Sequence, residues 1–188
     1  MSVFPQVVAA NASFAASFGD RSRLAPAPRR KFAVLTCMDA RLDPARIVGL
    51  DEGDAHVIRN AGGRATGDAV RSLVISAKML GTREWFVIHH TNCGMQTFTN
   101  DTLADLLAQS LEPAGVAPCA TKGGSQAGRL VDFLPFTDLE RSVTEDVAAI
   151  RAHPLVSAII PIYGLVYDVH TGLLREVPEA MAVGAAVE

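Results

Sequence analysis

Two short apolar runs, each followed at once by residues that bind metal ions, constrain this chain more than any other feature. Residues 32–36 precede Cys37, and residues 85–89 precede His90 and Cys93. Continuous apolar runs of this length are typical of buried parallel strands. The carboxyl ends of such strands are where an open α/β sheet binds its ligands. We therefore expect these distant residues to meet at one edge of a sheet.

The residue types at these strand ends predict a zinc site. Cys37 and Cys93 would supply two thiolates and His90 an imidazole, which makes three of the four ligands of a tetrahedral zinc ion. A structural site normally closes its shell with four protein ligands, whereas a catalytic site keeps one position open. The pattern therefore indicates a catalytic zinc. The alternative is that these cysteines are small core residues beside a structural metal or no metal.

Strands and helices are expected to alternate along the chain. Apolar runs predict strands at 32–36, 55–59, 84–89 and 156–161, and residues 163–170 and 173–177 around Thr171-Gly172 predict a hairpin or an edge strand. Helical spacing and caps predict helices over residues 68–80 and 101–111, from Asp43, and from a capping box at Thr137 to Ile150. This alternation predicts an α/β fold with a mainly parallel central sheet flanked by helices and an edge strand or hairpin near the C-terminus.

The chain is expected to build one well-buried domain. Its 188 residues, 49% of them hydrophobic, are enough for one core and few for two. Residues 1–30 are interpreted as an N-terminal helical arm with a Pro-rich connector, residues 31–178 as the zinc-binding α/β domain, and residues 179–188 as a tail. Residues 113–128, rich in Gly, Pro, Ser and Thr, predict a long surface loop.

Charge and cysteine usage exclude several classes of protein. A net charge of −3 gives no basic footprint, so neither nucleic acid nor an anionic membrane is an expected partner. No apolar segment approaches the length that spans a bilayer, and the first residues lack the pattern of a secretory signal. Three cysteines, two of them in metal-like contexts, favour a reduced, cytoplasmic setting over a disulfide framework, with Cys119 as a spare thiol.

The expected ligands belong to two longer motifs, Cys-x-Asp-x-Arg at 37–41 and His-x-x-Cys-Gly-Met at 90–95. With the stretch from Gly53 to Gly63, these motifs resemble the β-class carbonic anhydrases. The similarity is dense from residue 32 to 98 and extends over residues 137–177. The resemblance implies a Zn²⁺ cofactor, reversible hydration of CO2 to bicarbonate, and at least a homodimer whose N-terminal segments grip the neighbouring subunit.

Asp39 and Arg41 carry the expected mechanism. Zinc lowers the pKa of bound water to about 7, so hydroxide becomes available as the nucleophile at neutral pH. Asp39 is expected to orient this hydroxide by accepting its hydrogen bond, and Arg41 to hold Asp39 bidentately. Without that restraint Asp39 would become the fourth ligand and exclude water. The family resemblance is compatible with both arrangements of Asp39. An open active site and a closed resting site therefore both fit the sequence.

Two other functions fit the same residues. The resemblance extends to relatives of the family that look like carbonyl sulfide and carbon disulfide hydrolases. Their substrates are linear and apolar, and the same hydroxide could attack them. A permanently closed Asp39–zinc bond would instead give a non-catalytic, zinc-stabilised module that binds bicarbonate or a protein. Asn92 stands where the family usually has Asp, which removes a charge near the site. His89 is expected to point away from His90, since successive strand residues alternate.

Overall fold

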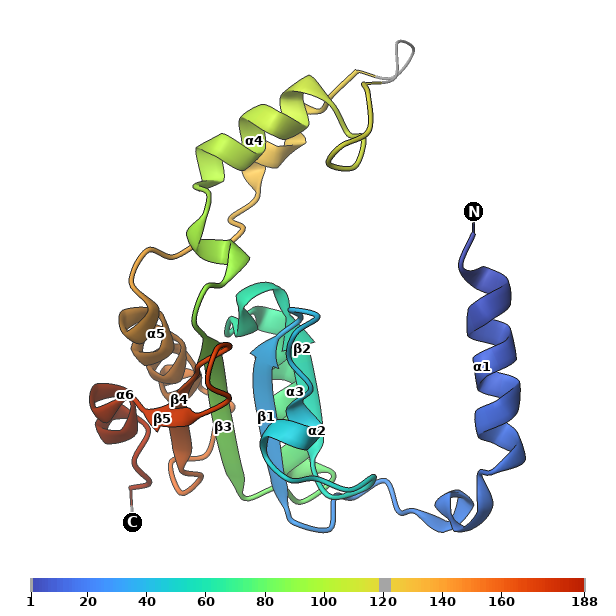
Figure 1. The fold of residues 1–188 in the computed structure, drawn as a ribbon. Helices are drawn as coiled ribbons and strands as arrows, with labels where there is room; N and C mark the ends of the chain where they lie inside the picture. The colour runs from blue at the N-terminus through green and yellow to red at the C-terminus, as the bar shows by residue number, and fades with distance from the viewer. Residues whose placement is uncertain (1, 119–122, 188) are drawn as a thin grey trace.

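A central sheet with helices packed against it organises the chain (Figure 1). The structure, a computed structural model, describes residues 2–118 and 123–187. Its helices are α1 (Phe4–Ala16), α2 (Pro44–Ile47), α3 (Gly67–Lys78), α4 (Asn100–Gln109), α5 (Leu139–Ala152) and α6 (Pro178–Val183). Short 3-10 helices lie at η1 (Gly19–Arg23), η2 (Ala61–Gly63), η3 (Gly94–Gln96) and η4 (Gln126–Leu130). Among the described residues, no helix is both long and apolar enough to cross a membrane.

The sheet has five strands in the order β2-β1-β3-β4-β5. The strands are β1 (Phe32–Cys37), β2 (His56–Asn60), β3 (Glu84–His90), β4 (Ile162–Tyr167) and β5 (Leu174–Glu176). All neighbouring pairs are parallel except β4 and β5, which are antiparallel. The predicted α/β fold, with a mainly parallel sheet and a C-terminal edge strand, is confirmed.

The strand order places the expected ligands side by side. β1 pairs with β2 on one side and with β3 on the other. The strand order therefore reverses between β1 and β3. Thr36 pairs with Ile88 near the carboxyl ends of these two strands. Cys37 and His90 are the last residues of β1 and β3. They therefore lie at the switch point, where open α/β sheets bind ligands.

The two faces of the sheet are covered unequally. Helices α3, α5 and α6 cover one face, where a large cluster of buried aliphatic side chains forms the core (Leu35, Leu73, Val87, Val147 and Ala180 among them). The other face carries a smaller cluster around Phe32, Val34 and Ile88. Alternation along β3 turns His89 toward Ser142 of α5 and leaves His90 on the opposite face, as predicted.

The predicted strand at residues 156–161 is wrong. These residues form turns, and β4 begins after them at Ile162. Pro161 has no amide hydrogen to donate, and only its carbonyl joins the sheet, by accepting from the Trp85 backbone N–H at 3.0 Å. The predicted hairpin around Thr171-Gly172 is confirmed, and its first strand also serves as the fourth parallel strand. The cap of α5 is Asp138 rather than Thr137, since its carboxylate accepts from the Arg141 backbone N–H.

Three further segments complete the fold. Helix α1 stands apart from the rest of the chain and buries no residue, and α4 projects from the carboxyl edge of the sheet (Figure 1). The C-terminal segment contains α6, whose Ala180 is fully buried. Within the expected loop at 113–128, η4 begins at residue 126, and Cys119 lies outside the described residues. The division into arm, domain and tail stays a prediction.

Candidate metal centre

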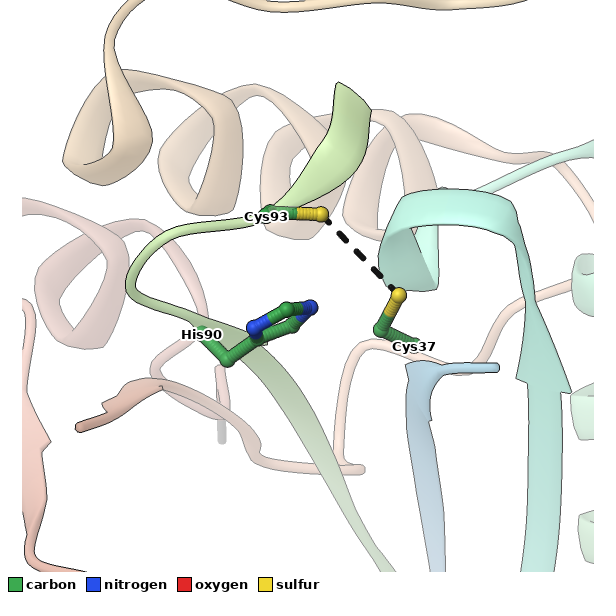
Figure 2. A group of neighbouring side chains, drawn as sticks. All are labelled: Cys37, His90 and Cys93. Carbon is green, nitrogen blue, oxygen red and sulfur yellow. Dashed lines mark hydrogen bonds between the residues drawn. The ribbon is translucent and has the colours of Figure 1, made fainter. Parts of the chain in front are cut away.

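The side chains of Cys37, His90 and Cys93 converge at the carboxyl edge of the sheet (Figure 2). All three are buried, and their ligand atoms lie within 4.8 Å of one another. The two sulfur atoms are 4.0 Å apart. Two sulfurs bound at 2.3 Å to one tetrahedral zinc ion would be about 3.8 Å apart. The donor set and its spacing therefore fit a zinc ion with little rearrangement.

The orientation of His90 also fits a metal ligand. Its Nδ1 lies 2.9 Å from the carbonyl oxygen of Thr91. Its Nε2 is fully buried and has no hydrogen-bond partner among the described residues. Buried polar atoms are nearly always satisfied. A metal ion bound at Nε2 would satisfy this atom, and the Nδ1 contact would hold the ring in place, as is usual for metal-binding histidines.

The two thiols interact directly with each other. The hydrogen bond with Cys93 lowers the pKa of Cys37 to about 4, and a weaker contribution comes from His90. The same hydrogen bond, together with burial, raises the pKa of Cys93. Cys37 therefore loses its proton more readily than Cys93, and a metal ion that bound both sulfurs would displace the remaining protons.

Backbone contacts fix the end of β1. Gly63 adopts a left-handed conformation (φ 71°), and a Cβ atom there would lie 3.0–3.1 Å from the backbone of Thr36 and Cys37. This close approach needs glycine. Arg59 donates to the carbonyl oxygens of Cys37 and Asp39 at 3.0 and 2.8 Å, a role that its sequence context did not reveal.

Asp39 is held beside the three ligands by Arg41. The Arg41 backbone N–H and Nε both donate to Oδ1 at 2.9 Å, and its second terminal nitrogen donates to Oδ2 at 2.7 Å. Oδ2 also lies 3.8 Å from Nε2 of His90. The Arg41 guanidinium holds the pKa of the Asp39 carboxyl well below its usual range, and Asp39 in turn raises the pKa of Arg41. Asp39 is therefore an ionised carboxylate that faces the site.

Asn92 contributes through its backbone. Its φ of 54° lies in the left-handed region, which Asn tolerates better than most residues. This turn brings Cys93 back toward His90, and the Asn92 carbonyl oxygen accepts a hydrogen bond from Arg41 at 2.8 Å. The sequence indicated only that the side chain of Asn92 lacks a charge. The structure shows that its backbone carbonyl contacts Arg41.

Apolar side chains surround the two sulfurs. Leu42, Met95 and Phe136 are buried with Cys37 and Cys93, and Phe98 packs against this group. Met95 and Phe98 follow Cys93 closely in sequence, whereas Phe136 comes from far along the chain, in the segment before α5. Trp85 is 1% exposed within the main core, so it has no part in the site.

Fold and site together define an α/β protein whose sheet carries a buried cluster of two cysteines and one histidine, able to hold a metal ion, at its switch point. A sequence model of the carbonic anhydrase family matches residues 32–174. The chain is 38% identical over 177 residues to beta-carbonic anhydrase 1 of Mycobacterium tuberculosis, which covers 94% of this chain and 99% of that protein. It is 35% identical over 168 residues to a carbon disulfide hydrolase of Acidithiobacillus thiooxidans, with coverage of 84% and 81%.

A solved structure gives the same result. The carbonic anhydrase of Streptococcus mutans aligns with a TM-score of 0.81 and 46% sequence identity, covering 94% of this chain and 98% of that one. The chain belongs to the β-class carbonic anhydrase family. The relatives of this chain thus include proteins named for two different activities, carbonic anhydrase and carbon disulfide hydrolase.

Proposed function

We propose that the protein is a zinc-dependent carbonic anhydrase, which converts CO2 and water to bicarbonate and a proton. The observation that carries this proposal is the Asp39–Arg41 pair beside the cluster of Cys37, His90 and Cys93. Zinc held by these three residues would act as a Lewis acid that lowers the pKa of water to about 7 and makes hydroxide available at neutral pH.

The proposed role of Asp39 is to hold a proton of the attacking water. A carboxylate has about four lone-pair positions, and Arg41 uses three of them, two on Oδ1 and one on Oδ2. The remaining position is on Oδ2, the oxygen that lies 3.8 Å from the metal-facing nitrogen of His90. A hydrogen bond accepted there would point an oxygen lone pair of the water toward CO2.

The role of Arg41 is to keep Asp39 out of the metal's fourth position. Its guanidinium is itself anchored, because it donates to the Asn92 carbonyl oxygen at 2.8 Å as well as to Asp39. For Asp39 to move onto the metal, it would have to give up its charged, two-pronged partner. This arrangement supports an enzyme over a non-catalytic module that binds bicarbonate or a protein, which would need the fourth position closed.

The second candidate function is hydrolysis of carbonyl sulfide or carbon disulfide. Similarity to proteins named carbon disulfide hydrolase supports it, as does the apolar surface that Leu42, Met95 and Phe136 provide. Parallel assays of CO2, carbonyl sulfide and carbon disulfide on one zinc-analysed sample would separate the candidates. We expect CO2 hydration to be fastest. Hydrolysis of a sulfur substrate without CO2 hydration would overturn the assignment, and a zinc-loaded protein inactive on all three would favour the binding module.

We also propose that the protein acts as a homodimer in the cytoplasm. Helix α1 leaves Phe4, Val7, Val8 and Phe14 exposed, which supports packing of this helix on a second copy. The less covered face of the sheet has a cavity of about 360 Å³ lined in part by Phe32, Phe86 and Leu174. Light scattering would test the dimer: we expect twice the monomer mass, and a loss of dimer when residues 1–16 are removed. The cytoplasmic location rests on cysteine usage alone.

A further inference from the structure

A cluster of buried polar side chains lies on the opposite face of the sheet from His90, and the proposed reaction gives it no role. It consists of Arg64, His89, Ser142 and Asp146, which we call the Asp146 cluster. Each of these residues is at most 6% exposed. Charged side chains are rarely buried this deeply, and they then require partners. The contacts of the cluster show which parts of the chain these partners connect.

Asp146, on α5, is the centre of the cluster. Its Oδ2 accepts a hydrogen bond from Nε of Arg64 at 2.7 Å, and its Oδ1 accepts from the Ala65 backbone N–H at 3.1 Å. Oδ2 also lies 3.1 Å from Nε2 of His89. The other ring nitrogen of His89 is 2.8 Å from the Ser142 hydroxyl, one turn earlier on the same helix. The side chain of His89, which precedes His90 in sequence, thus contacts α5 at both ring nitrogens: Nδ1 lies within hydrogen-bond distance of Ser142, whereas Nε2 faces Asp146 without a well-aligned hydrogen bond.

Arg64 extends these contacts toward the thiolates. One of its terminal nitrogens donates to the Leu134 carbonyl oxygen at 2.9 Å. Its guanidinium lies 5.5 Å from the centre of the Phe136 ring, and that ring stacks on His89 at 5.6 Å. Phe136 in turn packs with the group that contains Cys37 and Cys93. The guanidinium therefore holds the segment that forms an apolar wall of the metal centre.

We propose that Arg64 and Asp146 are a positioning pair for the metal centre. Through His89, Asp146 fixes the end of β3, which carries His90. Through Leu134 and Phe136, Arg64 fixes the wall beside the two sulfurs. Groups behind metal ligands commonly change metal affinity by 10–100-fold when they are altered. The proposal rests on the metal site of the proposed function. It adds residues that would touch neither the metal nor the substrate.

The main test variant is the double substitution Arg64→Met, Asp146→Asn. It removes both charges, so neither is left buried without its partner, and the Asn oxygen can still accept from Ala65. Arg64→Lys is the second variant: it keeps the positive charge beside Asp146 but loses the planar fork that reaches Leu134 and Phe136. The control is Arg29→Met, Asp54→Asn, an ion pair of the same length (2.7 Å) before β1 and β2, at the other edge of the sheet.

Three measurements on each variant test the positioning role: thermal unfolding, the zinc dissociation constant by competition with a chromogenic chelator, and the visible absorption of the cobalt-substituted protein. We expect both Arg64 variants to bind zinc about tenfold or more weakly, with altered cobalt absorption, and the control to change only the unfolding temperature. Folded Arg64 variants with wild-type zinc affinity and cobalt absorption would overturn the proposal. A wild-type protein that binds zinc but does not hydrate CO2 would remove the proposed function and leave this test intact.

Discussion

Asp39 is bound by Arg41 through both of its carboxylate oxygens, at 2.9 and 2.7 Å, while the second of these oxygens lies 3.8 Å from Nε2 of His90. The carboxylate is thus beside the three side chains proposed to bind zinc and is turned away from them by its arginine. The geometry corresponds to the open one of the two arrangements that the sequence allowed. Several consequences of this arrangement can be measured.

Replacing either metal-binding cysteine by serine should abolish zinc binding. Cys37→Ser and Cys93→Ser each remove a thiolate, and a serine hydroxyl is a poor ligand in its place. We expect both purified variants to contain little zinc by atomic absorption and to lose most of their activity. Cys119→Ser is the control and should retain metal and turnover. Full zinc occupancy in the two site variants would remove the basis of the site assignment.

CO2 hydration should become faster as the pH rises through neutrality. Arg41 lowers the pKa of Asp39 well below its usual range, so Asp39 is already ionised throughout the assay range. The increase must therefore report deprotonation of the attacking water, whose pKa a zinc ion brings to about 7. A crystal structure at high pH should show Asp39 still paired with Arg41. Asp39 bound to the metal at high pH, in a fully active enzyme, would contradict this mechanism.

The lowered pKa of Asp39 also predicts how it contributes to folding stability. A carboxyl whose pKa is lower in the folded than in the unfolded chain is stabilising above the unfolded value of about 4, and this stabilisation is lost as the pH falls through the folded value. The stability difference between wild type and Asp39→Asn should therefore be constant from about pH 5 to 8 and shrink below about pH 4. Urea unfolding of the metal-free proteins at several pH values measures it. A difference that grows toward acid would show that the Arg41 pair does not stabilise the fold.

Gly63→Ala should disturb both the fold and the end of β1. The residue has a φ of 71°, and a Cβ atom there would press on the backbone of Thr36 and Cys37. We expect a loss of about 1–3 kcal/mol in unfolding free energy, together with weaker zinc binding, because Cys37 moves. Gly67→Ala is the matched control, since a Cβ atom there meets nothing within 4 Å and the backbone conformation is ordinary. Equal effects of the two substitutions would rule out the close contact as the cause.

The convergence of Cys37 and His90 was predictable because each residue stands at the end of a strand signal. Cys37 and His90 come at the ends of continuous apolar runs, and parallel strands present their carboxyl ends at one edge. The Asp146 cluster gave no such signal. Arg64 and Asp146 are 82 positions apart, and each resembles an ordinary surface charge in the sequence. Only the packing of α5 against the end of β3 brings them together.

The error at residues 156–161 has a similar physical origin. A short apolar run does not distinguish a strand from a turn that packs on a core. Ile160 is buried in the main core, while Leu155 and Ile159 remain about 70% exposed, so the run does not have two buried faces. Pro161 then prevents regular strand pairing, and β4 begins one residue later, at Ile162. Pro161 was the local signal that the strand begins after it, at Ile162, and that residues 156–161 do not form one.

The last prediction separates Asp39 from Arg41 as parts of one catalytic unit. Asp39→Asn keeps the shape of the side chain but removes the charged acceptor, and Arg41→Ala frees Asp39 to move onto the metal. Each should lower kcat by about a hundredfold, the effect expected from misplacing one catalytic group. Zinc content, measured alongside, should stay unchanged, because neither residue is among the three proposed ligands.

Because both substitutions disrupt the same oriented carboxylate, their effects should not add. The double variant should therefore be little slower than Arg41→Ala alone. A double-mutant cycle on kcat, with zinc content held equal, measures the coupling between the two residues. If the two losses multiply instead, Asp39 and Arg41 act independently. The three hydrogen bonds between them would then be structural, and the orienting role of Asp39 would have to be abandoned even if the zinc assignment held.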